Sequence, residues 1–262
     1  MSNTQRFPRA GGSAARYSAR AVLGAGAVIL VAVPFALLLV LVEDKWSPLA
    51  GADQGARDDL HRYALTHPGF VAVMRFLSDS GSAHTWVIVL ALVVGWLLWR
   101  RLWRLALYVA VTGVGSSLLN TAVKAVVHRP RPLVDLALVN EPGASFPSGH
   151  AQAAVTGYGI VLLVFLPVVR GYWRRAAITV AVVMVLGIGF SRVALAAHFV
   201  SDVLAGFILG AAWLAAMTAM FSAWRVQRGR PAVQPAQGLA PEQAVRLDPT
   251  QPDPAAQAPA GE

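Results

Sequence analysis

The sequence predicts an all-α integral membrane protein, a bundle of six transmembrane helices. Only 13% of its 262 residues are charged, about half the share of an ordinary soluble domain. In contrast, 56% are apolar and the mean hydropathy is +0.55. The apolar residues also form blocks of about 20, the length that an α-helix needs to cross a bilayer. This composition argues against a soluble globular enzyme, and the absence of cysteine excludes disulfides and thiolate metal sites.

Five apolar blocks supply the six spans. In chain order they cover residues 21–42, about 84–99, 105–127 with Lys124 inside, about 150–169, and 176–224. The last block is roughly twice the length of a single span, so it is expected to hold two helices and a short connection. Residues 21–226 therefore form one predicted membrane domain.

Basic residues predict the orientation of this domain, because Lys and Arg are retained on the cytoplasmic side of a membrane. Thirteen arginines flank the spans on a single side: Arg6, Arg9, Arg16, Arg20, Arg100, Arg101, Arg104, Arg170, Arg174, Arg175, Arg225, Arg228 and Arg230. Ahead of the C-terminal tail, the acidic residues lie on the opposite side or at its edge. We therefore expect a multi-pass protein of the cell membrane with both termini in the cytoplasm. The net charge of +9 then reflects topology, and no nucleic-acid partner is expected.

Three segments lie outside the predicted spans. Residues 1–20 form a basic cytoplasmic segment; they could instead begin a signal peptide, but the following apolar block is longer than the roughly 7–15 residues usual for such a signal. Residues 45–82 mix charges with apolar residues at helical spacing and predict one or two short helices at the outer interface, broken at Pro68-Gly69. This segment fits either a packing loop or a lid for lipid entry. Residues 227–262 are rich in Pro, Ala and Gln, which predicts a disordered cytoplasmic tail.

Three polar clusters interrupt the apolar pattern at helix ends. They are K-A-V-V-H-R-P-R-P at 124–132, F-P-S-G-H at 146–150, and S-R-V-A-L-A-A-H-F-V-S-D at 191–202. An ionisable residue at membrane depth is costly, so it marks a functional site by default. Because successive helices alternate in direction, the predicted topology brings all three clusters to one surface. This predicts an active site at the extracytoplasmic helix ends.

The residue types in these clusters suit a phosphate group. Lys124, Arg131 and Arg192 supply three cations, and an arginine offers a planar fork that matches phosphate oxygens. Ser148 and Gly149 precede or begin a helix whose first N–H groups are unpaired and favour an anion. Gly149 has no Cβ, so an oxyanion can approach its amide closely.

Two histidines can divide phosphoryl-transfer chemistry between them. One of His150 and His198 would attack phosphorus while the other protonates the leaving oxygen. Asp202 follows His198 by four residues, which predicts a position on the same helical face, where its carboxylate can hold the His198 Nδ1–H. A lone Lys or Arg near a helix end is explained by snorkelling to the interface. Snorkelling does not explain three ionisable residues within one apolar block.

Residues beside the clusters have less specific interpretations. Arg129 fits two roles, a phosphate contact or a headgroup contact, and His128 is interpreted as a rim residue. Polar residues in the third span, Ser116, Ser117 and Asn120, are interpreted as helix-packing groups. The pair Gly206-x-x-x-Gly210 is typical of close helix packing and is also compatible with dimerisation.

The clusters resemble the three-part signature of the type 2 phosphatidic acid phosphatase (PAP2) superfamily. That signature is K-x6-R-P, then P-S-G-H, then S-R-x5-H-x3-D. Every position is filled here: Lys124 with Arg131-Pro132, Pro147 to His150, and Ser191-Arg192 with His198 and Asp202. The six-span layout is similar as well.

The resemblance implies a membrane lipid phosphatase with a role for each signature residue. It implies that His198 forms a phosphohistidine, that His150 is the acid for the leaving group, and that Asp202 orients His198. It implies a phosphate pocket lined by Lys124, Arg131, Ser148, Gly149, Ser191 and Arg192. It also implies that the enzyme needs neither a metal nor another cofactor, in keeping with a site that has no carboxylate cluster.

The expected reaction removes the terminal phosphate of a lipid phosphate or diphosphate in the bilayer. An isoprenoid diphosphate carrier of the undecaprenyl diphosphate type ranks first, ahead of phosphatidate and phosphatidylglycerophosphate. A phosphotransferase that passes the same phosphoryl group to an acceptor is one alternative. A non-enzymatic lipid-binding or transport protein is another. The vanadate-dependent haloperoxidases of the same superfamily are soluble, so the predicted spans count against that branch.

Overall fold

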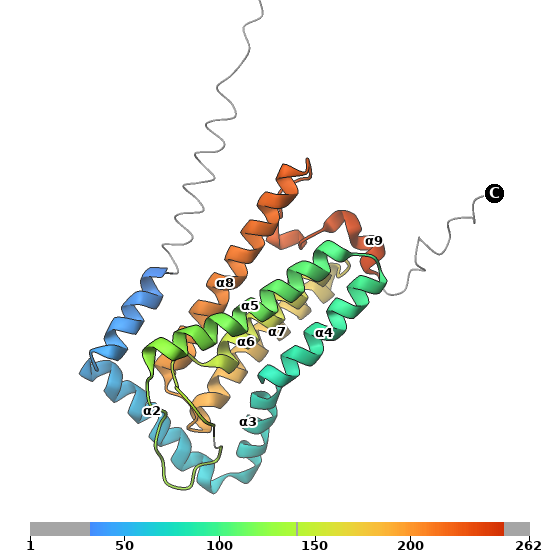
Figure 1. The fold of residues 1–262 in the computed structure, drawn as a ribbon. Coiled ribbons are helices and arrows are strands. Elements are labelled where there is room, and N and C mark those ends of the chain that lie inside the picture. Colours follow the sequence, from blue (N-terminus) through green and yellow to red (C-terminus); the bar gives the residue numbers. More distant parts are fainter. Residues whose placement is uncertain (1–31, 140, 249–262) are drawn as a thin grey trace, which may run out of the picture.

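The computed structural model describes residues 32–139 and 141–248, and its regular elements are helices (Figure 1). A single isolated β-bridge, between Gln234 and Gly238, is found in these ranges. The main helices are Ala32–Glu43, α2 (Ser47–Thr66), α3 (Pro68–Ser80), α4 (Ala83–Trp99), α5 (Trp103–Val127), α6 (Gly149–Phe165), α7 (Gly171–Ala194) and α8 (Val200–Gln227). Short turns of helix follow at η1 (Pro235–Gln237), η2 (Pro241–Gln243) and α9 (Ala244–Leu247). The prediction of an all-α protein is confirmed.

Three of the described helices, α5, α7 and α8, are long and apolar enough to cross a membrane. A fourth span results if α3 and α4, which meet at a bend of 44°, are counted as one. The six predicted spans are thus supported only in part. Both α4 and α6 have 17 residues, or roughly 26 Å of helix, slightly less than a hydrocarbon core of about 30 Å. Half of the first predicted span of residues 21–42, namely residues 21–31, lies outside the described residues.

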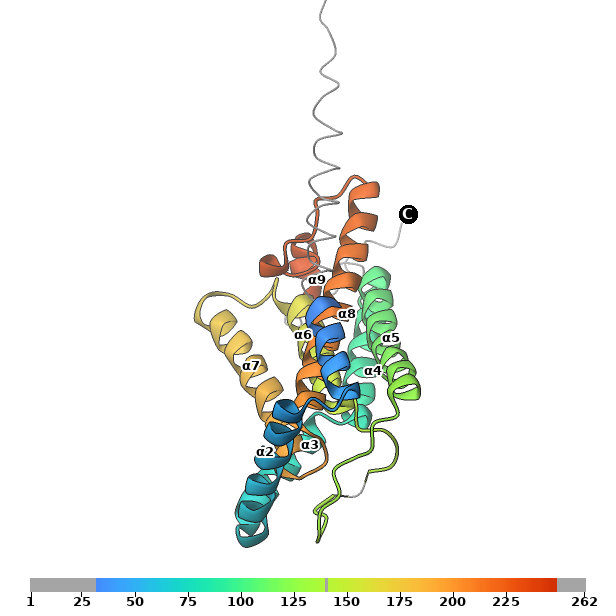
Figure 2. The same cartoon turned by 90° about the vertical axis from the view of Figure 1, so that its left-hand side faces the viewer.

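Helix α6 is the centre of the bundle and packs against α4, α5, α7 and α8 (Figure 2). Its close approach to α8 depends on two glycines of α8. A Cβ atom at Gly206 would lie 2.5 Å from the Ser148 carbonyl oxygen, and one at Gly210 would lie 2.9 Å from the Gln152 carbonyl oxygen. The packing role predicted for this glycine pair is confirmed. As a result, the start of α6 is pressed directly against the first turns of α8.

Polar side chains join α5 to α6 inside the bundle. The Ser116 and Thr156 hydroxyls lie 3.0 Å apart, and Asn120 Nδ2 donates to Gln152 Oε1 at 2.7 Å. Gln152 in turn donates to the Ser116 carbonyl oxygen at 2.8 Å. These bonds satisfy polar groups that the apolar surroundings would otherwise leave unpaired. They confirm the packing interpretation of Ser116 and Asn120, whereas Ser117 is exposed.

Residues 45–82 form two helices that break where proline predicts. Pro68 is the first residue of α3 and His67 is its N-cap, a position where the missing proline N–H is no loss. Helix α2 packs against α7 and α8, and α3 packs against α7. Both helices lie at the lower end of the bundle in Figure 1. Their location at a membrane interface stays a prediction.

The stretch that follows α8 is packed against the other end of the bundle (Figure 1). Leu239 and Leu247 are fully buried, and the Leu239 N–H donates to the Leu163 carbonyl at 2.8 Å. Arg225 donates two hydrogen bonds to the Glu242 carboxylate, at 2.9 and 3.1 Å. The prediction of disorder from residue 227 is therefore wrong for residues 231–248. Buried leucines, the ion pairs of Glu242 and hydrogen bonds from Arg100 hold this stretch without the helical periodicity on which the prediction relied. Residues 249–262 lie outside the described ranges.

Candidate active site

Residues from all three polar clusters meet around one carboxylate, that of Glu141. Arg131 Nη1 lies 3.1 Å from Glu141 Oε2, and Arg192 Nη2 donates to Glu141 Oε1. His150 Nε2 lies 4.0 Å from Oε1 of the same carboxylate. Arg131 Nη1 also lies 3.3 Å from His198 Nε2. The convergence that topology alone predicted is therefore present in the fold.

The geometry around His198 defines its tautomer. An arginine side chain has only donors, so Arg131 can bond Nε2 only if that nitrogen carries a lone pair. The hydrogen of the neutral ring then sits on Nδ1, which faces Asp202 Oδ2 at 3.5 Å. This separation is longer than a normal hydrogen bond, and Nδ1 has no other partner among the described residues. Burial lowers the pKa of His198 to about 4, although Asp202 acts to raise it, so the ring is neutral at neutral pH.

His198 does not share a helical face with Asp202, which corrects the sequence prediction. His198 lies in the connection between α7 and α8, with Phe199 as the N-cap and Asp202 in the first turn of α8. The Asp202 carboxylate instead turns back along the chain, and its Oδ2 accepts the Phe199 N–H at 3.0 Å. This is the backward bond that an acidic residue makes at the third position of a helix. It brings the carboxylate toward His198 by capping rather than by helical periodicity.

The P-S-G-H cluster forms the N-terminus of α6, as predicted. Ser148 is the N-cap, and its Oγ accepts the Ala151 N–H at 3.4 Å. The Ser148 N–H donates to the Asp202 carbonyl oxygen at 2.9 Å, which ties α6 to α8. At Gly149 a Cβ atom would come within 3.3 Å of Asn120 Oδ1, so glycine leaves room there. His150 follows on α6 with its side chain 19% exposed.

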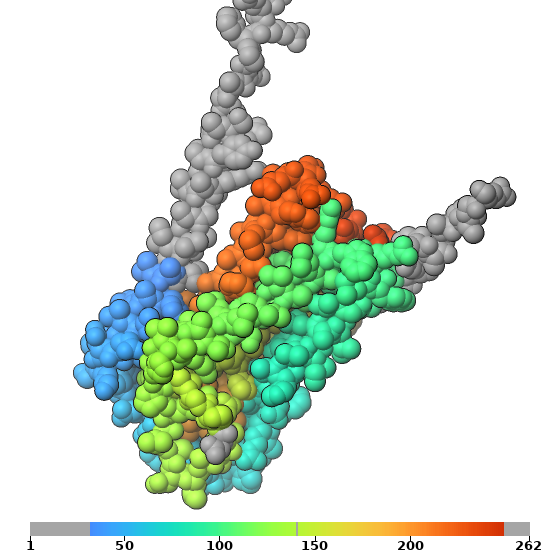
Figure 3. All heavy atoms as spheres, in the orientation of Figure 1, coloured from blue at the N-terminus to red at the C-terminus, as the bar shows by residue number. Residues whose placement is uncertain are grey.

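Two of the predicted phosphate ligands bind backbone carbonyls. Lys124 Nζ, in the last turn of α5, donates to the Ala144 carbonyl at 3.0 Å. Ser191 Oγ donates to the Ile188 carbonyl of its own helix at 2.7 Å. The lysine thus ties the loop of residues 128–147 to α5, and Figure 3 shows this yellow-green segment at the lower end of the molecule.

Glu141 is the central residue that no sequence pattern singled out. Burial acts to raise the pKa of its carboxyl, but the charges of Arg192, His150 and Arg131 hold that pKa below its usual value. Glu141 is therefore ionised, and it places an anion between two of the predicted phosphate-binding arginines. In the sequence, Glu141 is only an acidic residue in the loop between two of the clusters, and such a residue is too common to indicate function.

Arg129, considered for a phosphate or a headgroup contact, is an ion-pair partner of two carboxylates in this structure. It pairs with the carboxylates of Asp202 and Asp53, and its guanidinium lies 4.4 Å from the centre of the Phe199 ring. Asp53, in α2, is only 1% exposed. In the sequence, Asp53 is distinguished only as one of the outer acidic residues. Nothing in the local pattern relates it to Ser201, its hydrogen-bond partner 148 positions further along the chain.

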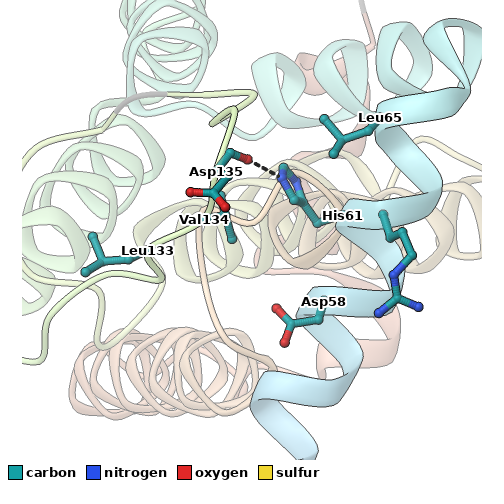
Figure 4. Close-up of a pocket in the computed structure, with 7 residues that line it drawn as sticks. Asp58, His61, Leu65, Leu133, Val134 and Asp135 are labelled. Atoms are coloured by element: carbon teal, nitrogen blue, oxygen red, sulfur yellow. Dashed lines mark hydrogen bonds between the residues drawn. The ribbon is translucent and has the colours of Figure 1, made fainter.

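Two surface hollows are found among the described residues, one near this cluster and one at the opposite ends of α5 and α8. One, of about 470 Å³, is lined by α2 and the loop after α5, and it is shown in Figure 4 with Asp58, His61, Leu65, Leu133, Val134 and Asp135 labelled. There His61 Nε2 contacts the Asp135 carbonyl at 2.9 Å. The other hollow, of about 390 Å³, is an apolar groove between α5 and α8. Within the described part of the chain, no group of three or more His, Asp and Glu side chains is arranged to hold a metal ion.

The sequence is similar to those of characterised proteins. The model of the PAP2 superfamily matches residues 101–225, which include all three clusters. Phosphatidylglycerophosphatase B of Bacillus subtilis is 36% identical over 152 residues, 56% of this chain and 72% of the relative. Undecaprenyl-diphosphatase of Sulfolobus acidocaldarius is 29% identical over 187 residues, 68% of this chain and 85% of the relative.

A solved membrane protein has the same fold. The transmembrane PAP2 type phosphatidylglycerolphosphate phosphatase from Bacillus subtilis superposes with a TM-score of 0.64 at 27% identity. The superposition covers 74% of this chain and 94% of that structure. Together with the apolar helices, this likeness makes the protein a multi-pass membrane protein. Signature, sequence similarity and fold agree, and the chain belongs to the PAP2 superfamily.

Proposed function

We propose that this PAP2 phosphatase removes the terminal phosphate of a lipid phosphate or diphosphate through a phosphohistidine formed on His198. The observation that supports this proposal is the convergence of Arg131 and Arg192 on one carboxylate, next to two histidines. Arginine forks that bind a carboxylate also match phosphate oxygens. A substrate phosphate would take the place that the Glu141 carboxylate fills.

The first step transfers the phosphoryl group to the enzyme. The lone pair of His198 Nε2 attacks phosphorus, and the bond from phosphorus to the leaving oxygen breaks with its electrons on that oxygen. His150 gives its proton to the leaving oxygen. The leaving group is a lipid alcohol from a phosphomonoester, or a lipid monophosphate from a diphosphate. Asp202 accepts the Nδ1–H and stabilises the positive ring that forms.

The second step returns the enzyme to its starting state. A water molecule attacks the phosphohistidine, His150 takes a proton from this water, and inorganic phosphate leaves as Nε2 regains its lone pair. Lys124, Arg131 and Arg192 stabilise the negative charge that spreads over the equatorial oxygens. The pocket is completed by the N–H groups at the start of α6, by Ser148 and Gly149, and by Ser191. Neither step uses a metal ion.

We further propose that the protein spans the membrane six times, with both termini in the cytoplasm and the site on the outer face. Support comes from the one-sided distribution of basic residues along the chain. It also comes from the fold, because the end of α5, the start of α6 and the α7–α8 connection carry the three clusters. The substrate would then enter from the outer leaflet, next to the interfacial segment of residues 45–82.

The relatives narrow the choice of lipid headgroup. One is named for phosphatidylglycerophosphate, a phosphomonoester, and the other for undecaprenyl diphosphate. We therefore place these two lipids ahead of phosphatidate. The proposed chemistry is the same for both, since His198 attacks a terminal phosphorus in each case.

The test is phosphate release by the detergent-purified protein from a panel of lipids. The panel contains phosphatidylglycerophosphate, undecaprenyl diphosphate, phosphatidate and water-soluble glycerol 3-phosphate, each with and without a chelator. We expect lipid substrates to be preferred, activity to survive the chelator, and His198→Ala and His150→Ala to be inactive. Exposed His84 provides the matched control, and His84→Ala should keep full activity.

Several results would contradict the proposal. Full activity in His198→Ala would refute the phosphohistidine, as would failure to trap an acid-labile radioactive phosphate on the wild-type chain. Equal turnover of glycerol 3-phosphate and every lipid would refute the substrate class. Loss of activity on chelation that is restored by metal would refute the metal-free reaction. Transfer of the phosphoryl group to an added alcohol in place of water would identify a phosphotransferase.

A further inference from the structure

A buried ion-pair network joins α2 to the carboxylate of Asp202. Asp53 and Asp202 are 1% and 0% exposed, and Arg129 lies between them. Arg129 Nη2 donates to Asp53 Oδ2 at 3.0 Å, and Nη1 donates to Asp202 Oδ1. One guanidinium therefore serves two carboxylates from helices that are distant in the sequence.

Asp53 also binds the first turn of α8. Its Oδ1 accepts the Ser201 N–H at 2.9 Å, and its Oδ2 accepts the Ser201 hydroxyl. Ser201 Oγ in turn accepts from Arg129 Nη1 at 2.7 Å. The Phe199 ring packs against the guanidinium, in the arrangement of a cation–π contact. Asp53 is thus a carboxylate at the positive end of a helix as well as a partner of Arg129.

The network divides the two oxygens of Asp202 between different tasks. Oδ1 accepts from Arg129, whereas Oδ2 accepts the Phe199 N–H and faces His198 Nδ1. A carboxylate held only by the Phe199 N–H could rotate about that single bond and turn away from the imidazole. Arg129 holds Oδ1, so Oδ2 stays directed to His198. None of Asp53, Arg129 and Ser201 belongs to the family signature.

We propose that Arg129 and Asp53 are positioning residues that act on His198 through Asp202. This inference rests on the proposed roles of His198 and Asp202. Arg129 fixes the orientation of the Asp202 carboxylate. Asp53 shares the positive charge of Arg129, so that Asp202 keeps enough negative charge to stabilise the imidazolium form of His198.

The two residues have opposite electrostatic effects on His198, and this separates positioning from damage to the fold. In Asp53→Asn, Arg129 pairs with Asp202 alone, so Asp202 stabilises the imidazolium form of His198 less. The pKa of His198 then falls, and the acid limb of the rate profile moves to lower pH. Arg129→Gln removes a positive charge, which moves that limb to higher pH. The other charged or titratable groups that face His198 are unchanged in both variants: Asp202, Arg131, Arg192, His150 and Glu141.

The experiment measures kcat, KM and the pH dependence of kcat/KM for the purified full-length chain with the best lipid of the panel. We expect kcat to fall about tenfold in Asp53→Asn, as for outer partners that orient a metal-bound histidine, with KM nearly unchanged. Arg129→Gln should lose more, and Arg129→Lys should recover part of the loss. Asp59→Asn is the matched control, because Asp59 lies on the same helix with its side chain 77% exposed.

The outcomes separate this inference from the proposed function. The positioning role alone would be overturned if His198→Ala is inactive but Asp53→Asn has the same pH profile of kcat/KM as Asp59→Asn. Shifts of the acid limb in the same direction for Asp53→Asn and Arg129→Gln would also overturn it. If Arg129→Gln fails to fold, Asp53→Asn and Arg129→Lys still decide the question through their pH profiles. A fully active His198→Ala would instead overturn the proposed function.

Discussion

Glu141 fills the place between two arginines that we assign to the substrate phosphate, so its removal should strengthen the binding of phosphate. The prediction concerns Glu141→Gln, which keeps the size of the side chain and removes its charge. In the wild type an incoming phosphate must displace a carboxylate that contacts Arg192 and lies 3.1 Å from Arg131. The glutamine amide is a weaker competitor, because it carries no charge to pair with either guanidinium.

The size of the effect follows from the charge-assisted bonds that a glutamine does not form. A hydrogen bond to a charged group contributes about 1.5–3 kcal/mol to stability. The Glu141 side chain is 27% exposed, so screening by solvent favours the lower end of this range. A change of about 1.4 kcal/mol is a factor of ten in an equilibrium constant. We therefore expect inhibition constants for phosphate and vanadate about tenfold lower in Glu141→Gln than in the wild type.

The assay is competitive inhibition of lipid dephosphorylation by inorganic phosphate and by vanadate at neutral pH. Asp135→Asn serves as the control, since it removes an exposed carboxylate from the same loop. Inhibition constants in Glu141→Gln that equal or exceed those of the wild type would refute the reasoning. That result would mean that the glutamate assists anion binding, or that phosphate binds elsewhere.

Three further predictions concern pH, helix packing and the C-terminal segment. Burial lowers the pKa of His198 to about 4, below the unfolded value of about 6.5. The neutral His198 ring therefore contributes to the stability of the fold above pH ~6.5, and this contribution to the free energy of unfolding is lost as the pH falls toward ~4. The rate profile of the free enzyme should show its acid limb near pH 4, and a limb near 6.5 would contradict the structure. Gly206→Ala would place a Cβ atom 2.5 Å from the Ser148 carbonyl oxygen, so we expect it to destabilise the fold by about 1–3 kcal/mol and to lower activity. Gly95 has open space around it, so Gly95→Ala should keep the wild-type stability in thermal unfolding and the wild-type rate in turnover assays. Arg225→Ala removes the bonds to Glu242 and to the Leu239 carbonyl; limited proteolysis should then cut residues 231–248 faster while kcat is unchanged, and equal cleavage rates would contradict a docked segment.

The helices could be predicted well from the sequence because their signals are local. The span predicted to end near Val127 matches α5, and the long last block divides into α7 and α8 around a short connection. Pro68 begins α3, since proline is tolerated only in the first turn of a helix. The prediction was wrong for residues 231–248, because buried leucines, ion pairs and hydrogen bonds replace the periodic pattern there.

The contacts between distant segments could not be predicted from the sequence, because no local signal marks them. Asp53 and Glu141 are ordinary acidic residues in their local surroundings, and each gains a role only through cations that other segments bring near. The pairing of His198 with Asp202 could be predicted from their spacing, but it arises from the capping bond that turns Asp202 back and not from helical periodicity.

By itself, the amino-acid sequence determined that this protein is an apolar helical membrane protein with three polar clusters in the order of the PAP2 signature. Composition and short spacings carry that information, because they depend only on neighbouring residues. Only the tertiary structure decided which charges pair. It assigned Glu141 to the arginines expected to bind phosphate, and Arg129 to Asp53 and Asp202. Ion pairs depend on distances of a few ångströms between segments far apart in the chain, and those distances exist only after the helices have packed.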